Sequence, residues 1–497
     1  MTVVLDLIIV VLILLLVSAV WWYATIPSNL PPGPLGLPFL GSALDTWRVA
    51  TWYSTLSKWS KQYGSVYKLY IGNQLVVVLG DWDAIQEAFV KQGDVYTGRP
   101  IFRVILPDEM AGVGLANSEG ELWKTQRRFA LSTLRDFGFG RPIIEPRIKD
   151  EAEYLLEAIG SSKGAPIDLT RLMSNAVSNV ICSLVFGRRF QYDDARFHHL
   201  LRLIRSRLSE TPISFMTPVV LSETVAKMAR ILPVVRELKR NSVQLMDFIR
   251  EQIGDAMGAF KVDCDEPTNY IQAFYKAQYD RKDDWTFSDE QLIASVGNLF
   301  VAGTDTTATT LRWGLLFMAH YPEIQEKVYQ ELVKQGGSGK SLFNYADRTS
   351  LPFTEAVIME TQRRANLLDV ALFRKTVAPS KLRGYDIPVG TVVAPLLGAV
   401  LKDPEVFPNP DQFDPNRFLA ESKDAKVYSY LIPFSAGKRI CLGESLAKME
   451  LFIFFTALLS RYRFYFPTDQ PTPPLHVPPA LIRAPSPYKI CAEPRTE

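Results

Sequence analysis

The sequence has almost no excess of charge and few of the residues that bind metals or form disulfides. It carries 55 Lys and Arg against 53 Asp and Glu in 497 residues, a formal net charge of +2. This balance argues against a dedicated nucleic-acid binder, which needs a basic excess to neutralise phosphates. Four cysteines are too few and too scattered for a disulfide framework or a C-x-x-C zinc site. They are Cys182, Cys264, Cys441 and Cys491.

Other absences narrow the function further. The four histidines include no H-E-x-x-H, so a zinc hydrolase of that type is dropped. A hydrophobic fraction of 47% and a charged fraction of 22% are those of a globular protein, which excludes wholesale disorder. We find no second linker and no low-complexity tract after about residue 40. The simplest organisation is therefore an N-terminal segment followed by one large domain.

The N-terminal run Leu7–Ala24 contains no charged residue and nearly reaches the ~20 apolar residues that span a bilayer as a helix. Trp21, Trp22 and Tyr23 lie at its end, where aromatic rings favour the membrane interface. A cleavable signal peptide is the alternative, but no Lys or Arg precedes the run, so an uncleaved anchor over residues 1–25 is favoured. The first basic residue, Arg48, is too distant to set the orientation by charge.

Residues 26–40 are rich in proline and include Pro31-Pro32-Gly33-Pro34, which predicts a stiff extended hinge. The body, residues 41–497, is predicted to be mainly helical with smaller β-sheets, an α+β class. Strand patterns occur at Val66–Tyr70 and Leu75–Leu79 around a Gly72-Asn73 turn. The stretch Pro467–Pro487 is expected to be irregular or an edge strand.

A long helix is predicted to begin at the cap Ser288 and to run until Pro322 stops it, about 32 residues or roughly 48 Å. Its middle, Ala302–Thr310, holds Gly303, five threonines and Asp305 between apolar flanks. Threonine hydroxyls compete for the carbonyl four residues back. One interpretation is a solvated patch or a tolerated kink. The other is a local opening beside which Asp305 and Thr306 pass protons to a small ligand.

Cys441 is the cysteine whose surroundings suggest chemistry. It follows Gly437 and Arg439 and lies just before a predicted helix from about Glu444 to Ser460. The positive end of that helix and the nearby arginine are expected to lower the pKa of the thiol and favour a thiolate metal ligand. For the other three cysteines the expected state is a buried, inert thiol.

The pattern F-x-x-G-x-R-x-C-x-G, from Phe434 to Gly443, resembles the haem-ligand loop of the cytochrome P450 superfamily. Three further segments match in the family's order: the oxygen-activation segment Ala302–Thr307, the E-x-x-R helix at Glu360–Arg363, and the element Pro415–Phe418. Taken alone, E-x-x-R is weak, and its pair could be an ordinary surface contact. The stretch Trp123–Gly138, with the anchor and hinge, is similar to the microsomal family 2 haem-thiolate monooxygenases. The resemblance covers essentially the whole chain and implies the cytochrome P450 fold.

The resemblance implies roles for individual residues. Cys441 would be the thiolate ligand of haem b (iron protoporphyrin IX). Phe434 and Gly443, at the two ends of its loop, would also bind the cofactor. Asp305 and Thr306 would supply protons, with O2 as co-substrate. The propionate-binding side chains would be Trp123, Arg127, Arg374 and Arg439. Phe373, before Arg374, stands where the family commonly has proline. A structural network would contain Glu360, Arg363 and Arg417.

The resemblance also implies partners and an apolar substrate. The chain has no G-x-G-x-x-G, so its electrons must be imported. By resemblance they come from NADPH through NADPH–cytochrome P450 reductase, with cytochrome b5 as a second candidate donor. Lys438, Lys448 and Arg128 could steer a donor or be ordinary solvated charges. The expected location is the endoplasmic reticulum membrane, with a single-pass anchor and a cytosolic catalytic domain.

The substrate pocket is expected to be apolar and to admit a fatty acid, a steroid or a xenobiotic. By resemblance it is lined by Val104, Phe300, Val301, Val370, Leu372 and Leu481. Asp369, in the same region, is expected to point to solvent. Two alternatives remain open. A haem-thiolate isomerase or peroxide-rearranging enzyme would not need Asp305 and Thr306. A membrane-anchored haem sensor would not need them either.

Overall fold

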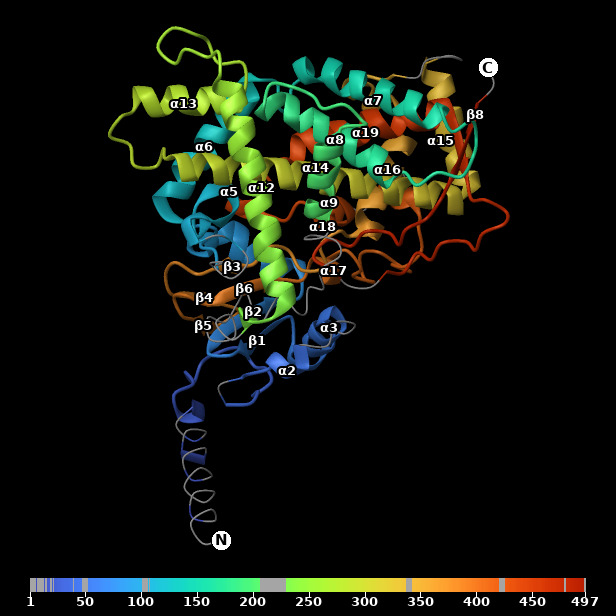
Figure 1. Ribbon diagram of the computed structural model, residues 1–497. Coiled ribbons are helices and arrows are strands. Elements are labelled where there is room, and N and C mark those ends of the chain that lie inside the picture. The colour runs from blue at the N-terminus through green and yellow to red at the C-terminus, as the bar shows by residue number, and fades with distance from the viewer. Residues whose placement is uncertain are drawn as a thin grey trace.

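The computed structural model describes residues 6, 13, 16–17, 20, 22–38, 40–46, 52–100, 106, 108–205, 229–336, 342–419, 425–477 and 480–495. Helices dominate, and Figure 1 shows them stacked above a smaller region of sheet. The longer helices are α3 (Trp52–Tyr63), α6 (Gly120–Asp136), α7 (Glu145–Gly160), α8 (Thr170–Val185), α9 (Ala195–Arg205), α12 (Pro233–Met257), α13 (Tyr270–Asp280), α14 (Asp289–His320), α15 (Pro322–Gly336), α16 (Pro352–Ala365) and α19 (Glu444–Arg461). The shorter ones are α2 (Ala43–Thr46), α4 (Trp82–Gln86), α5 (Gly114–Asn117), α17 (Leu397–Val400) and α18 (Ala425–Tyr430).

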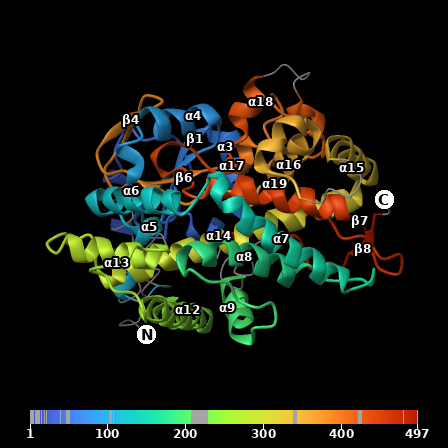
Figure 2. The same cartoon turned by 90° about the horizontal axis from the view of Figure 1, so that it is seen from above.

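The helix α14 lies at the centre of the molecule. Figure 2 shows it between α8 on one side and α19 and α16 on the other, and its contacts with these three helices agree. Most of its side chains are buried, including Leu299, Trp313 and Phe317. An element that is apolar nearly all round must be enclosed by others. The main hydrophobic core therefore surrounds α14.

The predicted ends of α14 are confirmed. Ser288 is its N-cap, and the Ser288 side chain accepts a hydrogen bond from the backbone N–H of Gln291. Pro322 begins the next helix. The sequence left two interpretations of the centre of α14 open, and the helix runs on across Gly303. The hydroxyl of Thr306 donates to the carbonyl of Ala302 at 2.8 Å, within the helix.

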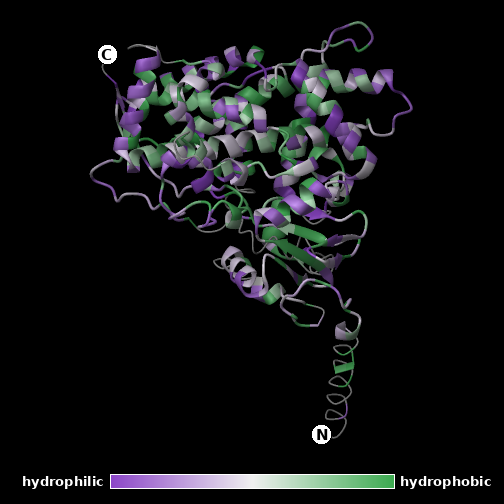
Figure 3. Ribbon diagram, turned by 180° about the vertical axis from the view of Figure 1, so that it is seen from behind, coloured by the Kyte–Doolittle hydropathy of each residue, from purple (hydrophilic) through white to green (hydrophobic). Residues whose placement is uncertain are grey.

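The sheets are small. The strands before residue 400 lie below the helical layers in Figure 1, whereas β8 (Cys491–Pro494) lies beside α15 among the helices. The largest has the strand order β1-β2-β6-β3, with antiparallel β1–β2, parallel β2–β6 and antiparallel β6–β3. Its strands are mostly hydrophobic (Figure 3). Two-stranded sheets pair β4 with β5 and β7 with β8. The strands are β1 (Val66–Ile71), β2 (Gln74–Leu79), β3 (Arg374–Lys375), β4 (Ser380–Leu382), β5 (Tyr385–Ile387), β6 (Val392–Pro395), β7 (Tyr462–Tyr465) and β8 (Cys491–Pro494).

Both sequence-predicted strands of the first hairpin are confirmed to within one residue. Gly72 turns between them with φ +59°. This left-handed conformation favours glycine because a Cβ is disfavoured there. The described part of Pro467–Pro487 holds neither helix nor strand, as expected.

The predicted anchor over residues 1–25 falls mostly outside the described residues. Within the described part of the chain, no helix has the length and hydropathy to cross a membrane. Trp22 packs edge-on against Tyr70 of β1, with ring centroids 5.4 Å apart. The hinge is docked on the same strand, because the backbone N–H of Lys68 donates to the carbonyl of Pro32 at 2.8 Å.

Candidate active site

The loop before α19 holds Cys441 in a backbone shape that the sequence encodes locally. The backbone N–H of Cys441 donates to the carbonyl of Phe434 at 3.1 Å, which closes the loop. Gly437 has φ +73°, and a Cβ there would lie 1.8 Å from the carbonyl oxygen of Phe89. Only glycine permits this approach. Gly443 is the N-cap of α19, so Cys441 lies just outside the helix N-terminus.

The expectation of a lowered pKa for Cys441 is wrong for the polypeptide. The side chain is accessible to solvent, yet enough protein surrounds the sulfur that burial raises the pKa of the thiol. The backbone N–H groups of Gly443 and Glu444 and the charge of Arg127 oppose that shift. Desolvation of the sulfur outweighs the helix terminus, and the same N–H donors are placed to stabilise a thiolate.

Four arginines converge beside this loop. Arg439, from the loop itself, donates to the carbonyl of Thr97 at 2.9 Å, and its guanidinium lies 3.9 Å from the ring centroid of Trp123. Arg127 of α6 donates to the carbonyl of Ile440 at 2.7 Å. The remaining two are Arg99 and Arg374.

The charges of these arginines are poorly compensated within the described chain. The pKa of Arg439 is lowered to about 8 by burial and then by Arg99, Arg374 and Arg127. The pKa of Arg99 is lowered to about 10, by burial and then by Arg127. Burial and two neighbouring arginines lower the pKa of Arg374 as well. Buried cations of one sign are costly unless an anion pairs with them.

Three buried N–H donors in this cluster find no hydrogen-bond partner among the described residues. They are Trp123 Nε1, Arg374 Nη1 and Arg439 Nη1. Native proteins rarely leave such groups unsatisfied. The arginine donors suit a bound molecule that carries carboxylates, and the neighbouring Cys441 suits a metal ion in the same molecule. The residues therefore fit haem b, with its two propionates.

The polar centre of α14 presents one accessible strip. Ala302 is exposed and Thr306, one turn later, is partly buried, whereas Thr304, Asp305 and Thr307 are buried. Asp305 is 3% exposed, so the acid predicted to pass protons lies within the helix packing rather than in open solvent.

The structure brings Glu360, Arg363 and Arg417 together. Glu360 and Arg363 of α16 form a bidentate pair at 2.7 and 2.8 Å, and both side chains are fully buried. Arg417 Nε lies 3.6 Å from the same carboxylate. Arg363 also donates to the carbonyl of Leu401 at 2.9 Å. Glu360 and Arg363 are therefore not an ordinary surface pair, which the E-x-x-R pattern alone would have allowed. Through Arg417 the pair also connects α16 to the chain that precedes the cysteine loop.

The expected pocket residues fall in different environments. Val104 lies outside the described residues. Phe300 is fully buried among the rings of other helices, including Phe197 and Phe248, and Val301 is partly buried beside it on α14. Two of the other three come just before β3, and the third lies in the irregular segment between β7 and β8. They are the buried Val370, the exposed Leu372 and the partly buried Leu481.

Some features were missed or misjudged from sequence. Arg99 carries no motif, yet it donates to the carbonyls of Ala116 and Leu372 at 3.2 and 2.9 Å and faces the arginine cluster. Lys438 and Lys448 are not free charges, since they pair with Asp94 and Glu444. The remaining cysteines divide: Cys182 and Cys491 are buried as expected, whereas Cys264 is exposed.

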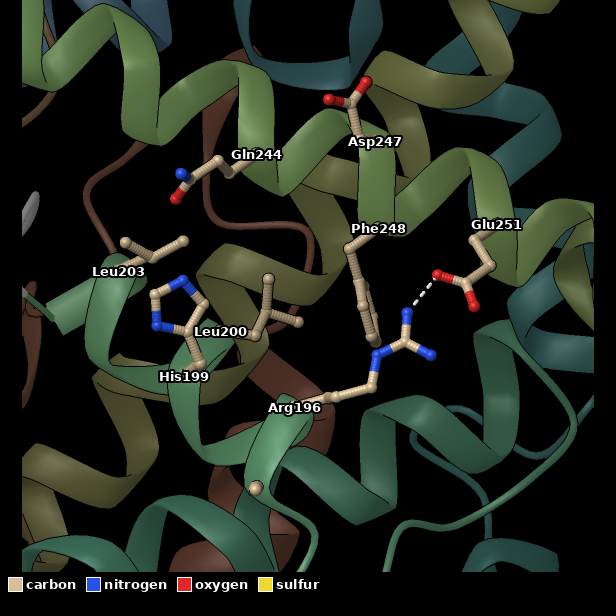
Figure 4. Close-up of a pocket in the computed structure, with 9 residues that line it drawn as sticks. Arg196, His199, Leu200, Leu203, Gln244, Asp247, Phe248 and Glu251 are labelled. Atoms are coloured by element: carbon tan, nitrogen blue, oxygen red, sulfur yellow. Dashed lines mark hydrogen bonds and ion pairs between the residues drawn. The ribbon is translucent and has the colours of Figure 1, made fainter.

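A separate surface hollow lies between α9 and α12 (Figure 4). Apolar side chains such as Leu200 and Phe248 line it together with His199, and an ion pair between Arg196 and Glu251 lies at its edge. It contains none of the residues of the Cys441 loop or the arginine cluster.

Known proteins are similar to this chain along nearly its whole length. A family profile described as Cytochrome P450 matches residues 31–492. Cytochrome P450 2C23 of Rattus norvegicus is 39% identical over 483 residues, 96% of each chain. Cytochrome P450 2G1 of Rattus norvegicus is 40% identical over 449 residues, 89% of this chain and 88% of the relative. Cytochrome P450 2H2 of Gallus gallus is 37% identical over 492 residues, 96% of each chain. The resemblance noted from the sequence is confirmed, and the chain belongs to the cytochrome P450 family of haem-thiolate monooxygenases.

Proposed function

We propose that this protein inserts one oxygen atom from O2 into a lipophilic small molecule, with electrons supplied by NADPH through NADPH–cytochrome P450 reductase. The observation that carries the proposal is the arginine cluster, with its three unsatisfied donors, beside the cysteine loop. A fatty acid, a steroid or a xenobiotic suits the apolar side chains expected around the substrate.

The cofactor roles follow from the donor chemistry. Cys441 would hold the haem iron, and its sulfur would accept hydrogen bonds from the N–H groups of Gly443 and Glu444. Trp123, Arg127, Arg374 and Arg439 would bind the propionates, with Arg99 as a fifth donor. Thiolate-ligated haem, when bound, supplies the activation of O2.

Two side chains of α14 would handle protons. The hydroxyl of Thr306 donates to the carbonyl of Ala302, so its oxygen can accept a hydrogen bond, and its own proton is passed on only when the bond to Ala302 breaks. Asp305 is the preceding residue of the helix, and its buried carboxyl would resupply that proton. Both residues are dispensable for an isomerase or a sensor, so their presence favours the monooxygenase.

The remaining proposals concern the location and the electron donors. We propose an anchor over residues 1–25, a hinge over 26–40 and a catalytic domain over 41–497 on the cytosolic face of the endoplasmic reticulum membrane. Cytochrome b5 is a second donor candidate. Arg128 is exposed on α6 and could contact a donor. Lys438 and Lys448 are weaker candidates, because acidic neighbours partly neutralise them.

The test is the spectrum of the purified protein after reduction under carbon monoxide. We expect the thiolate-type Soret band in the wild type and in Cys182→Ser, whose buried sulfur lies elsewhere on α8. Cys441→Ser should lose that band. A histidine-type band in the wild type, or a thiolate band in Cys441→Ser, would overturn the assignment.

A further inference from the structure

The sequence suggested that Asp369 points to solvent. In the structure its side chain is largely buried. Its carboxylate forms an ion pair with Arg483 at 3.5 Å, and the two side chains are only 13% and 8% exposed. The side-chain amide of Asn366 donates to the same carboxylate at 2.7 Å. Burial raises the pKa of Asp369, and Arg483 opposes that shift most strongly. The pair therefore joins two segments far apart in the chain.

The first segment is held rigidly at this carboxylate. Asn366, the C-cap of α16, has the left-handed φ of +39°, which is unfavourable for a residue with a Cβ. Its bond to Asp369 stabilises that turn. Gly398 packs so closely that a Cβ there would lie 2.8 Å from the Asp369 carboxylate. The carboxylate thus fills a tight site just before Val370.

Arg483 fixes the second segment through main-chain bonds as well. Its backbone N–H donates to the carbonyl of Leu367 at 2.8 Å. Its own carbonyl accepts a hydrogen bond from Trp313 Nε1 of α14 at 2.8 Å. Its guanidinium donates to the carbonyl of Ala365 at 3.3 Å. This residue therefore docks an otherwise irregular segment onto α14 and the end of α16.

The pair lies at the base of the two segments expected to border the substrate. Asp369 immediately precedes Val370, and Arg483 follows Leu481 and Ile482. Val370 and Leu481 pack in the same apolar cluster. Any change in the separation of Asp369 and Arg483 therefore moves two apolar walls relative to each other.

We propose that the Asp369–Arg483 ion pair is a positioning device that sets the size of ligand admitted between the Val370 and Leu481 segments. This inference rests on the proposed function, since it assumes that these segments border the substrate. Asp369→Asn leaves the buried Arg483 guanidinium without this carboxylate, which costs far more than the pair itself contributes. The Leu481 segment is then held only by the remaining bonds of Arg483 to Leu367, Ala365 and Trp313, and the limit on ligand size is relaxed.

The experiment measures ligand binding without turnover. Purified wild-type haem protein is titrated with imidazole and with 1-(triphenylmethyl)imidazole, which both shift the Soret band when the imidazole nitrogen binds the iron. The ratio of the two dissociation constants reports how strongly bulk is excluded. We expect Asp369→Asn to change this ratio in favour of the bulky ligand by about tenfold or more. A ratio within twofold of the wild type would overturn the inference.

Conservative variants separate positioning from stability. Arg483→Lys keeps the charge and should retain most of the size discrimination. Glu151→Gln is the matched control, because Glu151 pairs with Arg189 at 2.6 Å with a similarly buried carboxylate outside these segments. It should lower the melting temperature and leave the ratio unchanged. An equal change of ratio in Glu151→Gln would show a general loosening and overturn the inference.

Two outcomes keep the inference apart from the proposed function. If Asp369→Asn does not load haem, Asp369→Glu displaces the carboxylate by one methylene and should give a smaller change of the same sign; an unchanged ratio would reject the inference. If the wild type shows neither the thiolate band nor an imidazole shift, the proposed function fails first. If Asp369→Asn shows the thiolate-type band and the wild-type ratio of dissociation constants, the positioning role is rejected and the proposed function stands.

Discussion

At the scale of single residues, two glycines with a similar positive φ allow the effect of backbone strain to be distinguished from the effect of a steric clash. Gly437 has φ +73° and Gly384 has φ +84°, but only at Gly437 would a Cβ meet another backbone, 1.8 Å from the carbonyl oxygen of Phe89. A Cβ at Gly384 would meet no heavy atom of the described chain within 4 Å. We predict that Gly437→Ala prevents haem loading, since the Cys441 loop must move away from Phe89.

Gly384→Ala is the control for this prediction. It carries only the left-handed strain, roughly 1–2 kcal/mol, and should keep full haem content with a small fall in melting temperature. The measurements are haem per polypeptide and the thermal midpoint. Equal haem loading in both variants would contradict the importance of the Phe89 contact.

At this scale the sequence predicted backbone shape where its determinants are local, as at the turn of Gly437. The Cys441 loop is one short segment, so its glycines and arginine could be read together. Arg99 could not be found in this way, because it meets the cluster only in three dimensions. Asp369 was misjudged for the same reason, since its partner Arg483 lies far along the chain. The pKa of Cys441 was misjudged because the sequence carries no measure of desolvation.

At the scale of elements, the sequence predicts the ends of helices better than their neighbours. The ends of α14 were predicted from Ser288 and Pro322, which act within one turn of the chain. Its packing against α8 and α19 was not, since periodicity shows that a face is buried without showing what covers it. The docking of the hinge on β1 was missed likewise: prolines predict an extended segment, and Lys68 supplies the partner.

The contact between α14 and α19 contains a buried acid that predicts a pH dependence. Glu450 of α19 is 2% exposed, and burial raises its pKa well above the ordinary value, opposed only by a hydrogen bond with Thr307 of α14. The folded protein therefore keeps this proton at pH values where the unfolded chain, with a pKa of about 4.3, has lost it. The unfolded state binds fewer protons, so stability falls as pH rises through this window.

We predict that Glu450→Gln removes this loss. Its urea midpoint should exceed that of the wild type at pH 8, and the difference should shrink toward pH 5.5. The limiting slope is about 1.4 kcal/mol per pH unit for one proton. Urea titrations of both proteins at four pH values measure it. A difference that stays constant with pH, or that grows toward acid, would show that Glu450 is ionised in the folded state.

At the scale of the whole molecule, a net charge of +2 leaves association to local surfaces. Exposed leucines of the segment that leads into α2, at the sheet end of the molecule (Figure 1), offer one such surface. Its side chains are between 44% and 66% exposed. They are Leu35, Leu37, Leu40 and Leu44. Trp22 packs on β1 at the same end, so the chain leading from the predicted anchor reaches the body here.

We predict that this surface contacts lipid independently of the anchor. A chain lacking residues 1–25, which precede the family match at residue 31, should still sediment with phosphatidylcholine vesicles. Replacing Leu35, Leu37 and Leu44 together by serine should weaken its partitioning by about 100-fold, because each half-exposed leucine contributes about 1 kcal/mol on burial. Ile143→Ser is the matched control, since Ile143 is 70% exposed next to α7, in the helical layers away from the sheet end. Equal binding by the triple variant and the control would mean that the leucines face water, and that the predicted anchor alone holds the protein at the membrane.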